Sequence, residues 1–190
     1  MGKIVVTEFV SLDGVMEDPG GSESHRHGGW TFAFDRGEEG DRFKLDELAE
    51  AEAQLLGRVT YEGFAAAWPE REDPGGFAEK MNSMPKYVFS STLSEASWNN
   101  SKILDGELAD AVAKLHREVD GAILVAGSAQ LVQGLLERDL VDELRLMVFP
   151  VVLGEGKRLF GEVSEKKTLR LTDSKTVGDG IAILTYERTS

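Results

Sequence analysis

The sequence has 190 residues, 41% of them hydrophobic, and its 34 acidic residues outnumber the 21 basic ones to give a formal net charge of −13. This length and hydrophobic content suit one folded domain with a sizeable core, so we expect residues 1–190 to form a single domain. The negative charge argues against a nucleic-acid partner, because neutralising phosphates requires a basic surface. The chain has no cysteine, which excludes disulfide bridges, a thiolate nucleophile and a cysteine-ligated zinc ion.

The apolar segments predict a cytoplasmic protein that has no membrane partner. The N-terminal sequence MGKIVVTEFV lacks the basic region followed by a long apolar stretch that marks a secretory signal, and it is typical of a strand. The longest apolar run, LMVFPVVL from Leu146, is far too short to cross a bilayer as a helix.

Hydrophobic periodicity and turn residues predict alternating strands and helices in the first half of the chain. An apolar, β-branched run at 4–9 predicts a strand that stops at the turn SLDG. The patterns then predict, in chain order, an exposed loop (17–29), a helix (41–52), a strand ending at Gly57, and two short helices (60–68 and 77–84). The loop is rich in Gly, Pro, Ser and His and is longer than the usual connection, which is typical of a lid or a binding loop.

The second half of the chain continues the alternation and ends in strands. The patterns predict strands at 86–90, 99–104 and 122–126, helices at 107–119 and 129–138, and strands at 144–149, 168–177 and 181–188. The fully apolar segment 122–126 fits a central parallel strand that is buried on both sides. The last two strands, joined through Gly178-Asp179-Gly180, are expected to form a hairpin. We therefore predict an α/β fold with a mainly parallel sheet and an antiparallel C-terminal end.

Three strand ends carry turns that suggest a function. LLGRVTYEGF from Leu55, KYVFSSTL from Lys86 and ILVAGSAQLVQGLL from Ile123 each run from an apolar strand into a Gly-, Ser- or Thr-bearing turn, and the first and third then begin a helix. A strand-to-helix turn directs unpaired N–H groups and the positive end of the helix dipole at one point, which suits a phosphate. The first turn, SLDG, lacks the G-x-G-x-x-G of a Rossmann domain, so a dinucleotide would be held by another architecture.

The segments SLDG, LLGRVTYEGF, FSST and LVAGSAQLVQGLLERDLVDELRLMVFPVVLGEGKRLF, in this order and spacing, resemble the dihydrofolate reductase-like superfamily. They are most similar to the RibD C-terminal domain family, the reductase domain of bacterial riboflavin biosynthesis, and the resemblance covers residues 3–188. It implies a single dihydrofolate reductase-like domain with a central, mainly parallel sheet of about eight strands and helices on both faces. It also implies NADPH as the hydride donor and a homodimer.

The resemblance assigns cofactor-binding roles to residues at the three strand ends. These are Gly57, Arg58 and Thr60 at a phosphate grip, Ser90, Ser91 and Thr92 around the adenosine ribose and its 2′-phosphate, and Gly127, Ser128, Ala129, Gln130 and Leu131 at the pyrophosphate. Arg58 suits this role because a guanidinium forks onto a phosphate and stays charged. The structural alternatives are a surface ion pair for Arg58, a polar turn for the Ser90 segment and a simple helix cap for Ser128.

Asp13 is the candidate catalytic residue, since the resemblance places it at the edge of the nicotinamide and substrate pocket. The alternative is that Asp13 only forms the Asp-Gly turn. The apolar candidates for substrate binding, each of a type that is more often a core residue, are Val15, Trp30, Phe34, Phe64 and Phe149. Dihydrofolate reductases also place an acid on the first helix, where this chain offers Asp35, Asp41 and Glu47.

The sequence favours neither a metal site nor a second catalytic activity. His25 and His27 lie in one loop without a third ligand. The zinc deaminase that accompanies the riboflavin reductase needs cysteines, which this chain lacks. A phosphoribosyl substrate would call for basic residues near Asp13, for which Lys157 and Arg158 are the candidates.

These observations predict an NADPH-dependent reductase, an oxidoreductase that transfers hydride to a C=N or C=O bond of a small-molecule substrate. The substrate would be a small heterocycle, pterin- or pyrimidine-like, comparable with 5-amino-6-(5-phosphoribosylamino)uracil in riboflavin biosynthesis. The proton would come from water or from Asp13. The alternative is a protein of the same fold that binds NADPH without turnover.

Overall fold

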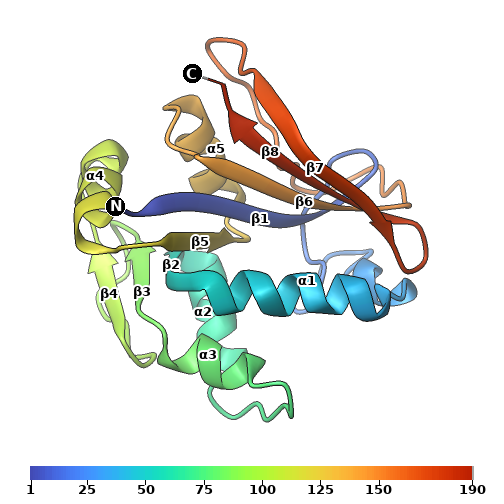
Figure 1. Cartoon of the computed structure of the whole chain (residues 1–190). Helices are drawn as coiled ribbons and strands as arrows, with labels where there is room; N and C mark the ends of the chain where they lie inside the picture. The colour runs from blue at the N-terminus through green and yellow to red at the C-terminus, as the bar shows by residue number, and fades with distance from the viewer. Residues whose placement is uncertain (190) are drawn as a thin grey trace.

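The fold is built on one mixed sheet of eight strands in the order β4-β3-β2-β5-β1-β6-β8-β7 (Figure 1). The computed structural model describes residues 1–189. The strands are β1 (Lys3–Ser11), β2 (Ala51–Gly57), β3 (Lys86–Phe89), β4 (Ser101–Leu104), β5 (Ala122–Ala126), β6 (Glu143–Phe149), β7 (Leu169–Val177) and β8 (Ile181–Arg188). The strands from β4 to β6 in this order are parallel, whereas β8 is antiparallel to both β6 and β7. The mainly parallel sheet with an antiparallel C-terminal end is therefore confirmed.

Helices cover both faces of the sheet, as predicted. They are the short 3₁₀ helix η1 (Trp30–Ala33) and the α-helices α1 (Gly37–Glu50), α2 (Arg58–Ala67), α3 (Phe77–Ser83), α4 (Leu108–Glu118) and α5 (Ala129–Glu137). Figure 1 shows α4 and α5 above the sheet and α1, α2 and α3 below it. Within residues 1–189, the helices are too short or too polar for any of them to cross a bilayer.

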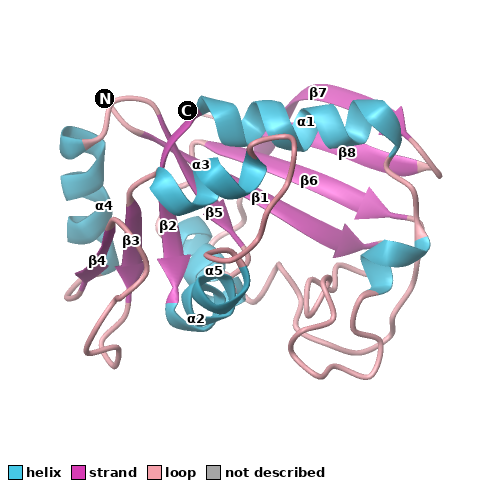
Figure 2. Ribbon diagram, turned by 90° about the horizontal axis from the view of Figure 1, so that it is seen from below, coloured by secondary structure: helices cyan, strands magenta, loops and turns pink. Residues whose placement is uncertain are grey.

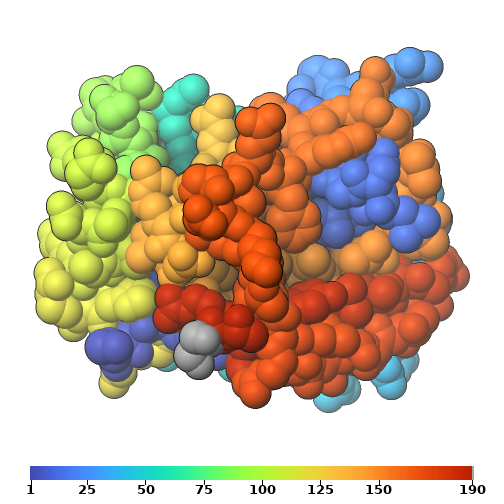
Figure 3. Space-filling model, turned by 90° about the horizontal axis from the view of Figure 1, so that it is seen from above, coloured from blue at the N-terminus to red at the C-terminus, as the bar shows by residue number. Residues whose placement is uncertain are grey.

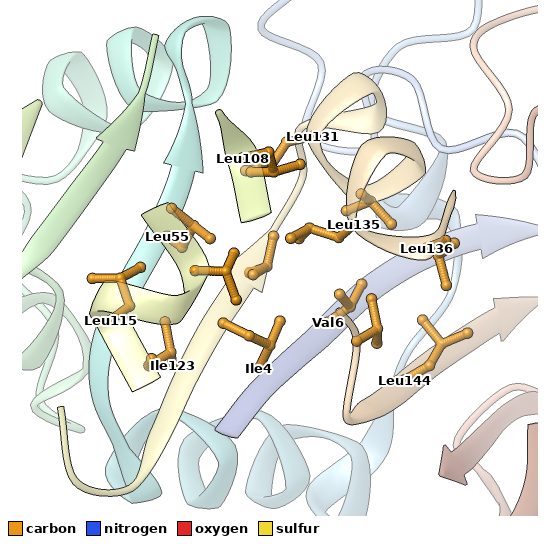
Figure 4. Packing of buried hydrophobic residues seen from close by; sticks show 14 of the residues in the cluster. Ile4, Val6, Leu55, Leu108, Leu115, Ile123, Leu131, Leu135, Leu136 and Leu144 are labelled. Carbon is orange, nitrogen blue, oxygen red and sulfur yellow. The ribbon is translucent and has the colours of Figure 1, made fainter. Parts of the chain in front are cut away.

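The central strands send alternate side chains into two different cores, which is why they are almost wholly apolar. On β1, Ile4 and Val6 pack with α4 and α5, while Val5 packs with the helices of the other face. Figure 4 shows Ile4 and Val6 on the side of the sheet that carries the leucines of α4 and α5. This burial fixes the register of β1, because a slip of one residue would exchange its two faces.

The structure moves the boundary between the first long helix and the second strand. The periodicity predicts a helix over 41–52, whereas α1 ends at Glu50 and β2 begins at Ala51. Ala51 and Ala53 are fully buried where β2 pairs with β5, and the ladder shifts register between them. Alanine favours a helix, so burial in this β-bulge outweighs local propensity.

The long loop after β1 is ordered around one buried carboxylate, that of Asp18. Its side chain accepts the N–H groups of Glu23 and His25 at 2.9 and 3.1 Å, and its carbonyl oxygen accepts those of Gly21 and Gly29. This turn built on an aspartate replaces regular secondary structure in the loop. Figure 3 shows the loop, in blue, packed against the orange segment that follows β6.

The first residue of β3, Lys86, is a buried cation that the sequence pattern does not reveal. Its side chain is fully buried, and its Nζ donates to the carbonyl oxygens of Asn82, Met84 and Asn99 at 3.0, 2.9 and 2.9 Å. Nζ also lies 4.2 Å from the centre of the Trp98 ring. Lys86 therefore joins the end of α3 to the segment that precedes β4.

Lys86→Met should destabilise the fold by roughly 3 kcal/mol, because it keeps the apolar stem but leaves buried carbonyl oxygens without a donor. In thermal unfolding this corresponds to a Tm lower by roughly 5–10 °C. Lys102→Met, at an exposed position of β4, is the matched control and should change the Tm little. An equal effect of the two substitutions would contradict a structural role for Lys86.

Candidate cofactor-binding and active site

The connections around β5 leave the sheet toward opposite faces at two neighbouring points along one edge. The helix after β5, α5, lies on one face, whereas α1 after β1 and α2 after β2 lie on the other. In the sheet, β5 lies between β2 and β1. The helix after β5 therefore lies on the opposite face from the helix after each of its two neighbouring strands. In open α/β sheets, ligands bind at points of this kind, beyond the carboxyl ends of the strands. We call the point between β2 and β5 the first crevice and the point between β5 and β1 the second.

The first crevice, between β2 and β5, is spanned by a hydroxyl bridge between two helix starts. Ser128 Oγ accepts the N–H of Gly57 at 2.9 Å and donates to Thr60 Oγ1 at 2.9 Å. These contacts hold the N-termini of α2 and α5 close together, and Figure 2 shows both helices at the ends of β2 and β5. Two helix starts thus direct free N–H groups and positive dipole ends at one place.

The turn from β5 into α5 has a backbone that few residues tolerate. Gly127 has φ +66°, and a Cβ atom there would lie 2.9 Å from Thr60 Oγ1. Ser128 also has a positive φ, 63°, which costs a residue other than glycine about 1–3 kcal/mol. The Ser128 hydroxyl makes no helix cap, so the interpretation of Ser128 as a simple cap is wrong. Its bridge to Gly57 and Thr60 offsets the backbone strain instead.

The other candidate phosphate-binding residues lie around this bridge. Ala129, Gln130 and Leu131 form the first turn of α5, where N–H groups have no acceptor within the helix. Arg58 begins α2, has a side chain that is 44% exposed, and pairs with Glu62 at 2.9 Å. Such an exposed pair is worth at most about 1 kcal/mol, so a phosphate can displace Glu62. Arg58 therefore forms the surface ion pair that was its structural alternative, and it also remains accessible to a ligand.

The hydroxyl-rich segment after β3 lies next to the start of α2. Gly57 of β2 pairs with Phe89 of β3, so the two strands end at the same level of the sheet. Ser90 Oγ accepts the N–H of Thr92 at 3.2 Å, which makes Ser90 part of a polar turn. Ser91 and Thr92 are exposed at this edge of the sheet. The Ser90 hydroxyl thus serves the turn, and the two exposed hydroxyls are the ones that a ligand can reach.

Asp13 lies in the turn after β1, and its carboxylate is fully engaged. It accepts hydrogen bonds from the Ser11 hydroxyl at 2.6 Å and from the N–H groups of Leu153 and Gly154 at 3.1 and 2.8 Å. These bonds, that of the Ser11 hydroxyl first, hold the pKa of Asp13 far below its usual range. Asp13 therefore stays ionised at neutral pH, which disfavours it as a proton donor. It ties the turn to the loop after β6, where Arg158 lies 3.8 Å away.

Several candidate substrate-binding residues meet in an aromatic cluster at the end of β6. Trp30 and Phe34 contact Phe149 edge-on, at ring-centre distances of 5.4 and 5.9 Å, and Phe9 does so at 5.6 Å. Trp30 and Phe149 are buried and support the cluster from within, whereas Phe9 and Phe34 are half-buried. The half-buried rings are therefore the ones placed to contact a substrate.

Two further apolar candidates lie outside the aromatic cluster. Val15 is fully buried and pairs with Arg158 in a short bridge between the loops after β1 and β6. Phe64, on α2, is partly buried and packs against a different core cluster, which includes Tyr61 and Trp98. Phe64 therefore has the core role that was the alternative for these residues, and it lies apart from the aromatic cluster.

Two cationic side chains lie against the aromatic cluster, although the chain as a whole is strongly acidic. Arg36 Cζ and Lys44 Nζ lie 5.8 and 5.1 Å from the centre of the Phe9 ring. Lys44 Nζ also donates to Thr7 Oγ1 at 2.9 Å and pairs with Glu47. Glu47 is buried between α1 and the sheet, so its charge is offset within this cluster.

The remaining polar candidates form a surface ion pair or hydrogen bonds within loops. Asp41 forms a surface ion pair, and the Asp35 carboxylate accepts the N–H of Gly37 at 2.8 Å where α1 begins. In the loop after β1, His25 Nδ1 accepts the N–H of His27 at 3.1 Å. The described part of the chain contains no group of three or more side chains with metal-ligand spacing.

A carboxyl group that the sequence analysis does not single out occupies the second crevice, between β5 and β1. β1 pairs with β5 as far as Thr7, opposite Ala126, so Glu8 is the first β1 residue beyond this ladder. Glu8 is 5% exposed, its Oε2 accepts the N–H of Gly127 at 3.1 Å, and its Oε1 has no partner within residues 1–189. Burial raises the pKa of Glu8 well above its usual range.

Comparison with known proteins identifies the family. The sequence pattern of the RibD C-terminal domain matches residues 2–183. The chain belongs to the RibD C-terminal domain family. The uncharacterized protein YyaP of Bacillus subtilis (strain 168) is 30% identical over 187 residues, which cover 97% of this chain and 94% of YyaP.

Solved structures with the same fold confirm the dihydrofolate reductase-like architecture. A putative riboflavin biosynthesis protein from Shewanella sp. PV-4 has a TM-score of 0.81 at 24% identity, with 99% of both chains covered. Dihydrofolate reductase from Enterococcus faecalis, solved with NADP(H), has a TM-score of 0.59 at 15% identity and covers 99% of this chain and 97% of its own. At these identities the likeness shows the fold and does not transfer an activity.

Within this RibD C-terminal fold, Glu8 is a candidate site residue that was not predicted from the sequence. The run IVVTEFV is typical of a buried strand, and its one acid breaks the apolar pattern. The alternation of side chains along a strand places Glu8 on the same face as Ile4 and Val6, which is a core face. A lone acid at a core position of a strand was therefore the signal that could have found it.

Glu8→Gln should change how the stability of the protein depends on pH. Since the pKa of Glu8 is raised in the fold, its stabilising contribution is complete below about pH 4.5 and is lost as the pH rises through the folded-state pKa. Glutamine stays neutral, and its side-chain oxygen can accept the same N–H of Gly127. The charges of Lys44 and Glu47, which act on Glu8 with opposite signs, are unchanged.

We therefore expect the free energy of unfolding of the Glu8→Gln variant to rise relative to the wild type as the pH increases from acidic to alkaline. Urea unfolding at a series of pH values measures this difference. A difference that does not vary with pH would show that Glu8 ionises as an ordinary carboxyl group.

Proposed function

We propose that this protein is an NADPH-dependent reductase, and the observation that carries the proposal is the Ser128 bridge to Gly57 and Thr60. The bridge brings the starts of α2 and α5 to one point, which offers the phosphates of a dinucleotide two sets of free N–H groups. Membership of the RibD C-terminal family and the fold shared with an NADP(H)-bound dihydrofolate reductase support the same cofactor.

The cofactor would lie across the carboxyl ends of the strands. Arg58 and the exposed hydroxyls of Ser91 and Thr92 would hold the adenosine end and its 2′-phosphate. The pyrophosphate would meet the first turn of α5, where Gly127 leaves room that any side chain would fill. The nicotinamide would enter the crevice between β5 and β1, beside Phe9 of the aromatic cluster.

NADPH supplies a hydride to a C=N or C=O bond of the substrate. The protein brings the two reactants together and excludes water, for which the rigid, buried rings of Trp30 and Phe149 are suited. The ionised Asp13 holds the turn after β1 against Gly154, so it shapes the pocket without carrying a proton. The proton would therefore come from water.

The side chains around the pocket favour a flat, polar substrate. Phe9 and Phe34 offer half-buried rings, and Arg36 and Lys44 place cationic donors beside the ring of Phe9. A pterin or a pyrimidine combines a flat ring with carbonyl oxygens that accept from such donors. If the substrate carries a phosphoribosyl group, Arg158 near Asp13 is the candidate for its phosphate.

A screen of substrates with NADPH absorbance as the readout tests the proposal. Pterins, pyrimidine-ribityl compounds and small carbonyl compounds are the classes to include. The engaged carboxylate of Asp13 favours one alternative, a protein that binds NADPH without turnover. That alternative predicts NADPH binding without oxidation by any of these compounds, and a failure to bind NADPH would contradict both functions.

The protein should bind NADPH more tightly than NADH, because Arg58 and the hydroxyls after β3 can contact the 2′-phosphate. A charge-assisted hydrogen bond of this kind is worth roughly 1.5–3 kcal/mol, or about 10- to 100-fold in affinity. Titrations followed by nucleotide fluorescence measure the preference. Equal affinities for the two nucleotides would contradict the assignment of these residues.

Arg58→Ala should remove most of this preference and leave the Tm nearly unchanged, since the side chain is exposed and leaves no cavity. Glu62→Gln is the matched control, because it removes the partner of Arg58 and keeps the guanidinium. We expect this variant to bind NADPH at least as tightly as the wild type. A large loss of Tm in Arg58→Ala would show that Arg58 is structural.

We also propose that the protein acts in the cytoplasm as a homodimer. Large apolar side chains are exposed on the loops and on η1 near the candidate site, including Leu12, Phe32 and Val152 at 63, 79 and 68%. Covering such side chains by a second copy would stabilise a dimer. Light scattering at micromolar concentration should give twice the chain mass of 20.8 kDa, and a monomer mass would contradict the proposal.

A further inference from the structure

We propose that Glu8 is a cofactor-recognition residue whose free carboxyl oxygen binds the carboxamide group of the nicotinamide. The inference rests on the proposed function, since it requires a nicotinamide dinucleotide at this edge of the sheet. Glu8 shares the face of β1 with Ile4 and Val6, so its side chain lies on the side of α5. Its bond to the N–H of Gly127 places the carboxyl at the turn where α5 begins.

The first argument is the unpaired oxygen. Glu8 is 5% exposed, and its Oε1 has no hydrogen-bond partner within residues 1–189. Leaving a buried polar oxygen unpaired costs about 1–3 kcal/mol. Apolar residues at Val6 and Val10, on the same face of the strand, avoid this cost. A carboxyl group at this position is therefore suited to a hydrogen-bond partner that comes from a bound ligand.

The second argument is the state of the carboxyl group. Burial favours its neutral form, while the charges of Lys44 and Glu47 on α1 act with opposite signs. Because Oε2 accepts the N–H of Gly127, the proton belongs on Oε1, which then donates. A neutral acid also avoids the repulsion that a carboxylate would exert on phosphates at the start of α5.

The third argument is position along the edge of the sheet. The Ser128 bridge marks the phosphate site in the crevice between β2 and β5, and Glu8 stands in the next crevice, roughly one strand spacing of 4.8 Å away. The side chain of the next residue, Phe9, points to the opposite face of the sheet, where it belongs to the aromatic cluster. The part of a dinucleotide that reaches from the pyrophosphate toward this cluster is the nicotinamide riboside. The hydrogen-bonding substituent of its ring is the carboxamide, whose oxygen would accept from Oε1.

Two ligands separate recognition of the carboxamide from support of the Gly127 turn. They are NADPH and 2′-phospho-ADP-ribose, which has the same phosphates but no nicotinamide, and calorimetry measures both affinities. Glu8→Leu should weaken NADPH about 10-fold or more and change the affinity for 2′-phospho-ADP-ribose by less than about threefold. Glu8→Gln keeps a donor and should retain the NADPH affinity within about threefold. Val6→Ala, on the same face of β1, controls for a general loss of core stability.

An equal loss for both ligands in Glu8→Leu would overturn the inference, because Glu8 would then only support the turn. If Glu8→Leu does not fold, Glu8→Asp takes its place, since it withdraws the carboxyl group by one methylene. That variant must show the same selective loss of NADPH, and an unselective result would again overturn the inference. A wild-type protein that binds neither ligand refutes the proposed function, whereas one that binds both but has unselective variants refutes the role of Glu8 alone.

Discussion

The candidate site depends on one hydroxyl group, that of Ser128, which joins two helices from opposite faces of the sheet. Its bonds to Gly57 and Thr60 hold the starts of α2 and α5 together at the end of β5. The residue types around it follow from this contact. A Cβ on Gly57 would lie 3.0 Å from Ser128 Oγ, and one on Gly127 would lie 2.9 Å from Thr60 Oγ1. Small residues and a strained serine backbone are therefore requirements of the close approach, and strain of this kind concentrates at functional sites.

Two carboxyl groups near the end of β1 have pKa values shifted in opposite directions, which their surroundings explain. Asp13 receives a hydroxyl and two backbone N–H groups, all of which favour the anion. Glu8 receives one N–H group and is otherwise buried, which favours the neutral acid. Surroundings that move the pKa values of two carboxyl groups apart in this way suit the two groups to different roles. The Asp13 carboxylate fixes a loop, and Glu8, where it is protonated, would be a hydrogen-bond donor.

The order of strands, helices and Gly-bearing turns could be predicted from the sequence because each depends on residues close together in the chain. The two alternatives for Asp13 could not be separated in this way, since an Asp-Gly turn looks the same in both. Its carboxylate is oriented by the N–H of Leu153, 140 residues away. The strand position of Ala51 and the buried cation of Lys86 depend likewise on packing against other elements. Contacts distant in sequence thus decide the features that local patterns leave open.

The acidity of the chain constrains how it can hold an anionic cofactor. With a net charge of −13, no general attraction draws a dinucleotide to the surface, so binding must rely on short-range contacts. Each helix start contributes about half a positive charge, and an ionised carboxylate at the start of α5 would cancel it. Burial of Glu8 disfavours that negative charge, while the carboxyl group still accepts the hydrogen bond from Gly127. The buried acid in the second crevice and the candidate phosphate-binding turn in the first would therefore act together on the charge of a bound cofactor.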